Sequence, residues 1–197
     1  IATKKTRVKK RDIDKPIENI RINIIENADE ILVQTELLDN KSGFSLSFKD
    51  NKEVDYLIFV PARFDVNIEN VHGNIEITDI EGEINVHLVN GKIDLLNPTG
   101  IVNAELINGN IMAEVHSTKG MKVNSVNGKI EMRLSDALNV KVIADITNGK
   151  VVTDEIEFIN AYDEKDHFTG KLGTGEYEIR LESINGKITL EKLDSRL

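Results

Sequence analysis

The chain is dominated by a strand-like alternation of apolar and polar residues. Residues 20–24, 44–48 and 64–68 alternate at every second position, as expected for strands that have one buried face. Residues 54–60 are more continuously apolar and predict a more fully buried strand, which Pro61 ends because proline cannot donate to a sheet ladder. No stretch shows the capped apolar stripe of an amphipathic helix. The pattern predicts an all-β fold.

A short unit recurs from residue 71 onward. It consists of Asn-Gly, a polar residue and a β-branched residue, and its first copy has His72 in place of asparagine. A fixed period of this kind indicates a repeat architecture. The last spacing is close to two periods, so one repeat between residues 150 and 185 is expected to be degenerate or to carry an insertion. The glycines of the unit are Gly73, Gly91, Gly109, Gly128, Gly149 and Gly186, separated by 18, 18, 19, 21 and 37 residues.

Each period divides into two strands and two turns. A second glycine lies about midway between units, at Gly82, Gly100 and Gly120. The residue four positions after the Asn-Gly glycine is mostly apolar and the positions between are mostly polar, which predicts one buried face. The residue two positions after that glycine is always β-branched and is predicted to be buried: Ile75, Ile93, Ile111, Ile130, Val151 and Ile188.

Two architectures fit this repeat. Asn-Gly is a strong signal for a tight hairpin turn and could build an antiparallel meander. A β-solenoid of about 18–21 residues per coil is favoured, because stacking places isoleucine on isoleucine and asparagine on asparagine, whereas a meander gives no reason to repeat the same residues. The predicted structural corner positions are Asn90, Gly91, Asn108, Gly109, Asn127, Gly128, Asn148, Gly149, Asn185 and Gly186.

The predicted layout has three parts. Residues 1–14 form a basic arm, residues 15–60 a β-rich cap, and residues 61–197 the solenoid repeats. An insertion at about 154–170 is expected to form a strand and a protruding polar loop. The final coil is expected to close the stack with a polar end that prevents edge-to-edge association. The residues suited to that role are Lys192, Asp194 and Arg196.

The order of these segments resembles the bacterial DUF4097 family of adhesin-like domains. An extended strand ending in Val60-Pro61 is followed by repeats of the Asn-Gly-x-Ile type, and Gly173-x-Gly175 precedes the last repeat. The resemblance covers roughly residues 15–193 and implies a β-solenoid that is exported or anchored at the cell envelope. The family has no agreed catalytic residues, so none is carried over. The chain departs from the pattern at His72 and in the acidic insertion after Val152.

Composition narrows the possible partners. The net charge of −9 argues against nucleic acid, which requires a basic face. The chain lacks cysteine and any apolar run of 18 residues, which excludes thiol chemistry and a transmembrane segment within this sequence. It begins at Ile1, so we expect that a signal or anchor was removed. A local basic cluster predicts a solvated arm or edge strand, or alternatively a juxtamembrane segment: Lys4, Lys5, Arg7, Lys9, Lys10 and Arg11.

Candidate chemistry is sparse. His87 and His116 alternate with apolar residues and should face outward, and no nucleophile elbow is present. Asp163, Asp166 and His167 could ligate a metal ion, but solvated side chains are the favoured interpretation, and no cofactor is expected. Carboxylates that could serve a glycan-acting enzyme lie beside a lysine row, which favours mutual neutralisation. Those carboxylates are Glu76, Asp94 and Glu131.

The expected function is therefore a non-catalytic one. The resemblance implies an adhesin-like binding or scaffolding module of the bacterial envelope, whose partner is a protein or glycan. The alternative is a regulatory accessory of an envelope-stress or membrane system, and a glycan-acting β-helix enzyme is less favoured. The candidate binding surface combines the outward lysine row with the insertion, because loops inserted into regular stacks often carry function; a purely solubilising surface is the favoured interpretation of the same residues. Its residues are Lys92, Lys129, Lys150, Lys187, Tyr162, His167 and Phe168.

Overall fold

The computed structural model describes residues 2–6, 20–26, 31–37 and 54–194. The chain divides into two compact units, Ile1–Phe59 and Val60–Leu197. The regular structure of the described residues consists of strands without helices, which confirms the predicted all-β class. Consequently, this part of the chain contains no helix long and apolar enough to cross a membrane.

The first unit contains two small antiparallel sheets. Strand β1 (Ala2–Thr6) pairs with β4 (Val54–Ile58), and β2 (Ile20–Glu26) pairs with β3 (Ile31–Leu37). The strands predicted over residues 20–24 and 54–60 are therefore present, whereas residues 44–48 lie outside the described part.

The greater burial predicted for the strand at residues 54–60 is wrong. Tyr56, Leu57 and Ile58 are exposed, and among the described residues β4 pairs with β1 alone. In the basic arm, Lys4 and Lys5 belong to β1, whereas residues 7–11 lie outside the described part. The basic segment therefore starts as a paired strand.

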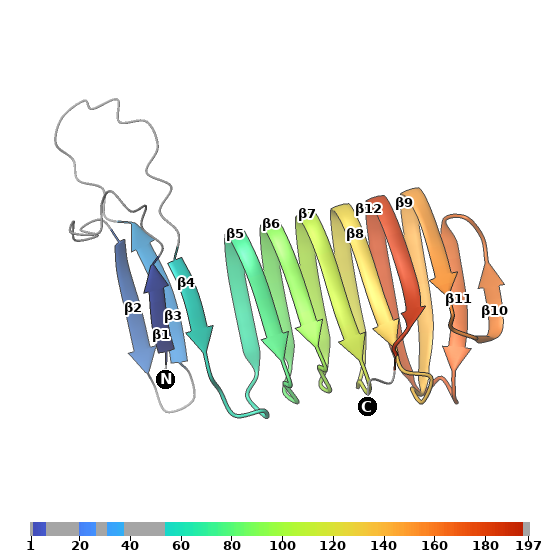
Figure 1. The fold of residues 1–197 in the computed structure, drawn as a ribbon, viewed down its shortest axis with the longest axis horizontal. Helices are drawn as coiled ribbons and strands as arrows, with labels where there is room; N and C mark the ends of the chain where they lie inside the picture. Colours follow the sequence, from blue (N-terminus) through green and yellow to red (C-terminus); the bar gives the residue numbers. More distant parts are fainter. Residues whose placement is uncertain (1, 7–19, 27–30, 38–53, 195–197) are drawn as a thin grey trace. The chain divides into compact units, whose positions relative to one another are not determined.

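The second unit is built on one mixed sheet of eight strands, in the order β10-β11-β9-β12-β8-β7-β6-β5 (Figure 1). Strands β5, β6, β7, β8, β12 and β9 pair in parallel, and β11 and β10 continue the sheet in antiparallel fashion. The strand bounds are β5 Val66–Thr78, β6 Ile84–Leu96, β7 Val102–Val115, β8 Met121–Leu134, β9 Val140–Asp154, β10 Ile159–Asp163, β11 His167–Leu172 and β12 Tyr177–Lys192.

The Asn-Gly units lie inside the long strands and not between them. Each strand continues through its unit, and glycine pairs with glycine from strand to strand. This parallel pairing excludes the antiparallel meander. Gly109 has a φ of +140°, and a Cβ added to it would lie 1.7 Å from the Gly91 carbonyl oxygen. Only glycine can therefore occupy this corner.

The core lies on the inner face of the long strands. Burial alternates along each strand, as the sequence pattern predicts. The core is almost entirely aliphatic, because the strands contribute Ile, Val and Leu at their inward positions. The β-branched residue two positions after each glycine is buried in every repeat: Ile75, Ile93, Ile111, Ile130, Val151 and Ile188.

The last repeat does not end the stack. Strand β12 lies between β8 and β9, and Asn185 pairs with Asn127 on one side and Asn148 on the other. The prediction of a C-terminal polar end is therefore wrong: Lys192 forms an ion pair with Asp136 at 2.8 Å, and Arg196 lies outside the described residues. Every Asn-Gly unit offers the same register, so a late strand can enter between two earlier ones.

The insertion adds strands to the sheet. Strand β11 pairs with the first part of β9, and β10 pairs with β11, so the predicted strand and protruding loop form a hairpin. This hairpin covers the outer edge of β9, and β12 occupies its other edge. The register of β10 shifts between Ile159 and Tyr162, an irregularity of the kind that limits edge-to-edge pairing.

Candidate functional site

A groove of about 1160 Å³ runs across the parallel strands, beside their Asn-Gly corners. Its lining comes from β5, β6, β7, β8, β12 and β9, and from the start of β11. Because the strands are in register, the same position of each repeat forms a row along the groove. At about 4.8 Å per strand, a row across the parallel strands is about 24 Å long.

One side of the groove is an apolar row. It consists of the residue that precedes the corner asparagine or histidine in each repeat. Val71, Ile107 and Ile184 are 56%, 44% and 46% exposed. Aliphatic side chains aligned in this way form a continuous exposed patch, which in soluble proteins marks an interaction site. In strand order, the apolar row is Val71, Val89, Ile107, Val126, Ile184 and Thr147.

The other side is an acidic row, two residues before the apolar row. Its members lie in register across the strands. His87 Nε2 lies 2.9 Å from Glu105 Oε2, and His167 Nδ1 lies 2.6 Å from Asp145 Oδ1. Among the residues that the structure describes, the groove is lined by five carboxylates, counting Asp166, and by neither lysine nor arginine. In strand order, the acidic row is Glu69, His87, Glu105, Asn124, Glu182 and Asp145.

The positions between the two rows carry side chains that point away from the groove, into the core. Leu88 and Leu106 occupy this inward position in β6 and β7, whereas Ser125 and Ser183 occupy it in β8 and β12. The serines pair in register and are 5% and 6% exposed. Among the described residues, neither hydroxyl has a hydrogen-bond partner, nor has Oδ1 of the adjoining Asn124. Such buried polar atoms are rare, because each costs about 1–3 kcal/mol.

The asparagines at the corners form a hydrogen-bonded ladder. The predicted stacking of asparagine on asparagine is present: each side-chain amide donates to the next one along the sheet. His72 ends this ladder, with its Nδ1 3.3 Å from Asn90 Nδ2. The donor–acceptor pairs are Asn108–Asn90 at 3.0 Å, Asn127–Asn108 at 2.9 Å, Asn185–Asn127 at 2.8 Å and Asn148–Asn185 at 3.0 Å.

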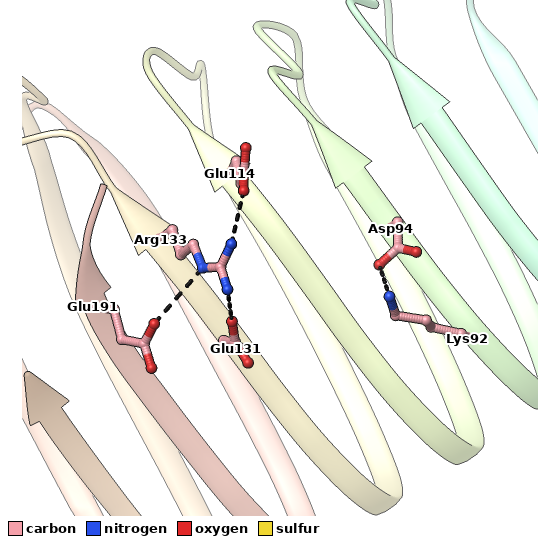
Figure 2. A network of polar contacts seen from close by, with 6 residues as sticks. All are labelled: Lys92, Asp94, Glu114, Glu131, Arg133 and Glu191. Atoms are coloured by element: carbon pink, nitrogen blue, oxygen red, sulfur yellow. Dashed lines mark hydrogen bonds and ion pairs between the residues drawn. The ribbon is translucent and has the colours of Figure 1, made fainter. Parts of the chain in front are cut away.

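The predicted lysine row lies on the other side of the corners and does not line the groove. Lys129, Lys187 and Lys150 occupy adjacent strands in register. Lys92 Nζ lies 2.9 Å from Asp94 Oδ1, so part of the row is neutralised locally (Figure 2). The predicted lysine surface and the groove are therefore separate features.

A second polar cluster ties three strands together on this side of the corners (Figure 2). Arg133 of β8 lies 2.9 Å from Glu114 of β7, 2.6 Å from Glu131 and 3.7 Å from Glu191 of β12. The hydrogen bond with Glu114 is the main cause that raises the pKa of Arg133, and Glu131 adds to it. These contacts neutralise acidic side chains and crosslink neighbouring strands.

The three aromatic candidates of the insertion have different environments. Phe168 is buried against Phe158, with ring centroids 4.8 Å apart, so its prediction as a binding residue is wrong: alternation in β11 places it in the core. Tyr162 is exposed and donates to Glu164, whose hydrogen bond raises the tyrosine pKa. His167 lies at one end of the groove.

The other candidates do not assemble into a site. His87 and His116 are exposed, as the alternation predicts. The described residues contain no group of three or more His, Asp or Glu side chains placed to hold a metal ion, so Asp163, Asp166 and His167 do not form the metal site considered above. The groove was not predicted, although its two rows are visible in the sequence as recurring residues two and four positions before each glycine, or one and three before each corner asparagine.

Comparisons with known proteins agree with the fold. The family model Toastrack DUF4097 matches residues 62–191. A crystal structure of a "putative cell adhesion protein" from Clostridium sporogenes ATCC 15579 is similar at a TM-score of 0.50 and 14% identity, covering 88% of this chain and 76% of that one. A comparison with curated proteins finds no match. The family model covers most of the second unit and confirms the resemblance found in the sequence: the chain belongs to the Toastrack DUF4097 family.

Proposed function

We propose that this chain is a non-catalytic binding module of the bacterial cell envelope and that the groove is its binding site. The single observation that supports this most is the alignment of an exposed apolar row and an acidic row along one groove. In this proposal, the parallel strands are successive coils of a β-solenoid, and the stacked coils form a rigid support for the binding site. The period of 18 or 19 residues between most stacked asparagines supports that description.

The chemistry of the groove favours binding over catalysis. A serine nucleophile requires an adjacent base that takes its proton. Ser125 and Ser183 are buried, and their hydroxyls have no hydrogen-bond partner within the described part of the chain. The two histidines of the groove are instead paired with Glu105 and Asp145. The exposed histidines and carboxylates can thus contact a ligand, whereas the buried serines lack the adjacent base that would activate a nucleophile.

The envelope location is supported by the family and by the fold. The resemblance implies export or anchoring, and the similar crystal structure is described as that of a "putative cell adhesion protein". Cell fractionation and protease treatment of intact cells of the producing bacterium test this part. Cleavage of the full-length protein on intact cells, or its recovery with the membrane or wall, agrees with the proposal. Recovery in the cytosol alone contradicts it.

Binding is tested with a combined array of peptides and bacterial glycans. The full chain is compared with an Ile107→Asp/Ile184→Asp variant, which places two charges on the apolar row. Ile101→Asp is the matched control, because Ile101 is 47% exposed and lies outside the groove. The proposal expects array spots that the wild type and the control bind and that the groove variant loses. Absence of any such groove-dependent spot contradicts it.

A further inference from the structure

We propose that the groove binds an extended cationic polypeptide, and that a lysine or arginine of this polypeptide occupies a polar subsite at Asn124. This inference rests on the proposed function and specifies the partner of that same groove. The subsite is formed by the central strands β7, β8 and β12. Glu105 and Glu182 flank Asn124 in the acidic row.

The charge of the lining selects a cation. Five carboxylates line the groove, whereas the lysine row and Arg133 lie outside it. Two of these carboxylates, Glu105 and Asp145, face a histidine. Glu69, Glu182 and Asp166 have no ion pair with lysine, arginine or histidine within the described residues apart from a contact of 3.9 Å between Glu182 and Arg180. The groove therefore carries a negative field that attracts positively charged partners and repels acidic ones.

The neutral Asn124 lies between two glutamates of the acidic row. Asn124 Nδ2 donates to Glu105 Oε1 at 3.5 Å, and Glu182 lies in register on the other side of Asn124. A lysine ammonium has three donors and an arginine guanidinium has five. One such group can contact both flanking glutamates, which no neutral apolar group can do.

The apolar row distinguishes a polypeptide from a sugar polymer. None of the described phenylalanine and tyrosine side chains lines the groove, so this part of the chain offers no large aromatic surface on which sugar rings usually pack. An extended peptide directs successive side chains to opposite sides. Laid along the groove, it presents basic residues to the acidic row and aliphatic residues to Val71, Ile107 and Ile184. About seven extended residues, at about 3.4 Å each, span the length of about 24 Å.

Fluorescence polarisation with labelled eight-residue peptides tests this inference on the full chain. The main probe alternates lysine and valine. A second probe alternates glutamate and valine, and a third alternates lysine and serine. The first should bind and should weaken as salt is raised, because exposed charges are screened. The second should not bind. The third should bind more weakly than the first, because it lacks contacts with the apolar row.

Paired variants locate the binding. Glu105→Gln/Glu182→Gln should weaken the lysine–valine peptide about tenfold or more, since each exposed pair contributes up to about fivefold. Glu76→Gln/Glu176→Gln removes the same charge from exposed positions outside the groove and should leave the affinity within about twofold. Circular dichroism and the melting temperature establish that each variant is folded.

The outcomes separate the two proposals. Equal weakening by both glutamate pairs, or equal binding of the glutamate–valine peptide, overturns the cationic polypeptide. Groove-dependent binding of glycans alone on the array also overturns it but leaves the groove as a binding site. If the array shows no groove-dependent binding of any class, the proposed function itself is wrong.

Discussion

Replacing Ile111 with alanine should destabilise the second unit by about 3–4 kcal/mol. Ile111 is 1% exposed and lies in β7, between Ile93 of β6 and Ile130 of β8. The substitution removes three carbon atoms, which lowers the transfer contribution by about 2.4 kcal/mol at about 0.8 kcal/mol per group. The neighbouring strands are fixed by the hydrogen-bond ladder and cannot collapse fully into the space, so a cavity cost is added.

Thermal and urea unfolding followed by circular dichroism measure this change. At about 2–4 °C per kcal/mol for a domain of this size, the melting temperature should fall by about 10 °C. Ile111→Val, which removes one methylene group, should cost about 0.5–1.5 kcal/mol. Ile101→Ala is the control: Ile101 is 47% exposed, so the same chemical change should cost well under half as much.

The series of substitutions can refute the assignment of the inward face. If Ile111→Ala and Ile101→Ala lower the melting temperature equally, Ile111 does not lie in a closely packed core. An unchanged melting temperature for Ile111→Asp would be stronger still, because that variant buries an unpaired charge in an aliphatic row. Either result would mean that the face of the strands that carries Ile111 is not the buried one.

Four further substitutions test the corners and one surface pair. Gly109→Ala should unfold the protein, because its Cβ would meet backbone at 1.7 Å, whereas Gly73→Ala, with its nearest contact at 3.3 Å, should cost only the strain of its φ; circular dichroism distinguishes them. Asn127→Ala interrupts the amide ladder and should lower stability by about 1–2 kcal/mol in urea unfolding, and no loss would mean that the ladder is only decorative. The hydrogen bond with Lys192 lowers the pKa of exposed Asp136 below its usual 3.8. The stabilising effect of this ion pair should therefore be present above pH 3.8 and be lost as the pH falls through the lowered pKa. An NMR titration should return the pKa of Asp136 toward 3.8 in Lys192→Met, and an identical titration in both proteins would exclude the pair in solution.

Much of the second unit could be predicted from the spacing of its repeats. The glycine spacing and the β-branched residue after it were sufficient to predict the corners, the buried row and the amide ladder. Local steric constraints explain this success, since only glycine fits the corner at Gly109. The position of β12 could not be predicted in the same way. Asn185 has the same chemistry as every other corner asparagine, so the sequence sets the register of β12 but not its neighbours.

The groove depends on features that the repeat unit alone does not express. Its rows precede the corners, and Val71 and Ile107 lie just before the histidine or asparagine that begins the repeat unit. Their exposure depends on how the strands bend at the corners, which is a property of the folded sheet. The prediction that Phe168 is an exposed binding residue was wrong because of strand pairing. The acidic residues before it suggested a loop, whereas pairing of β11 with β9 determined that its side chain faces inward.

The position of β12 has a consequence for the route by which the chain folds. Strands β8 and β9 are consecutive in sequence but are separated by β12 in the finished sheet. Their Asn127 and Asn148 units have matching registers, so they can pair with each other before β12 is available. On a ribosome, the strands from β5 to β8 can therefore join the sheet in the order in which they are synthesised. The next strand made, β9, does not pair with β8 in the native sheet. A direct β8–β9 pair is then a trap that must reopen, and insertion of the last strand becomes the step that commits the molecule to its native state.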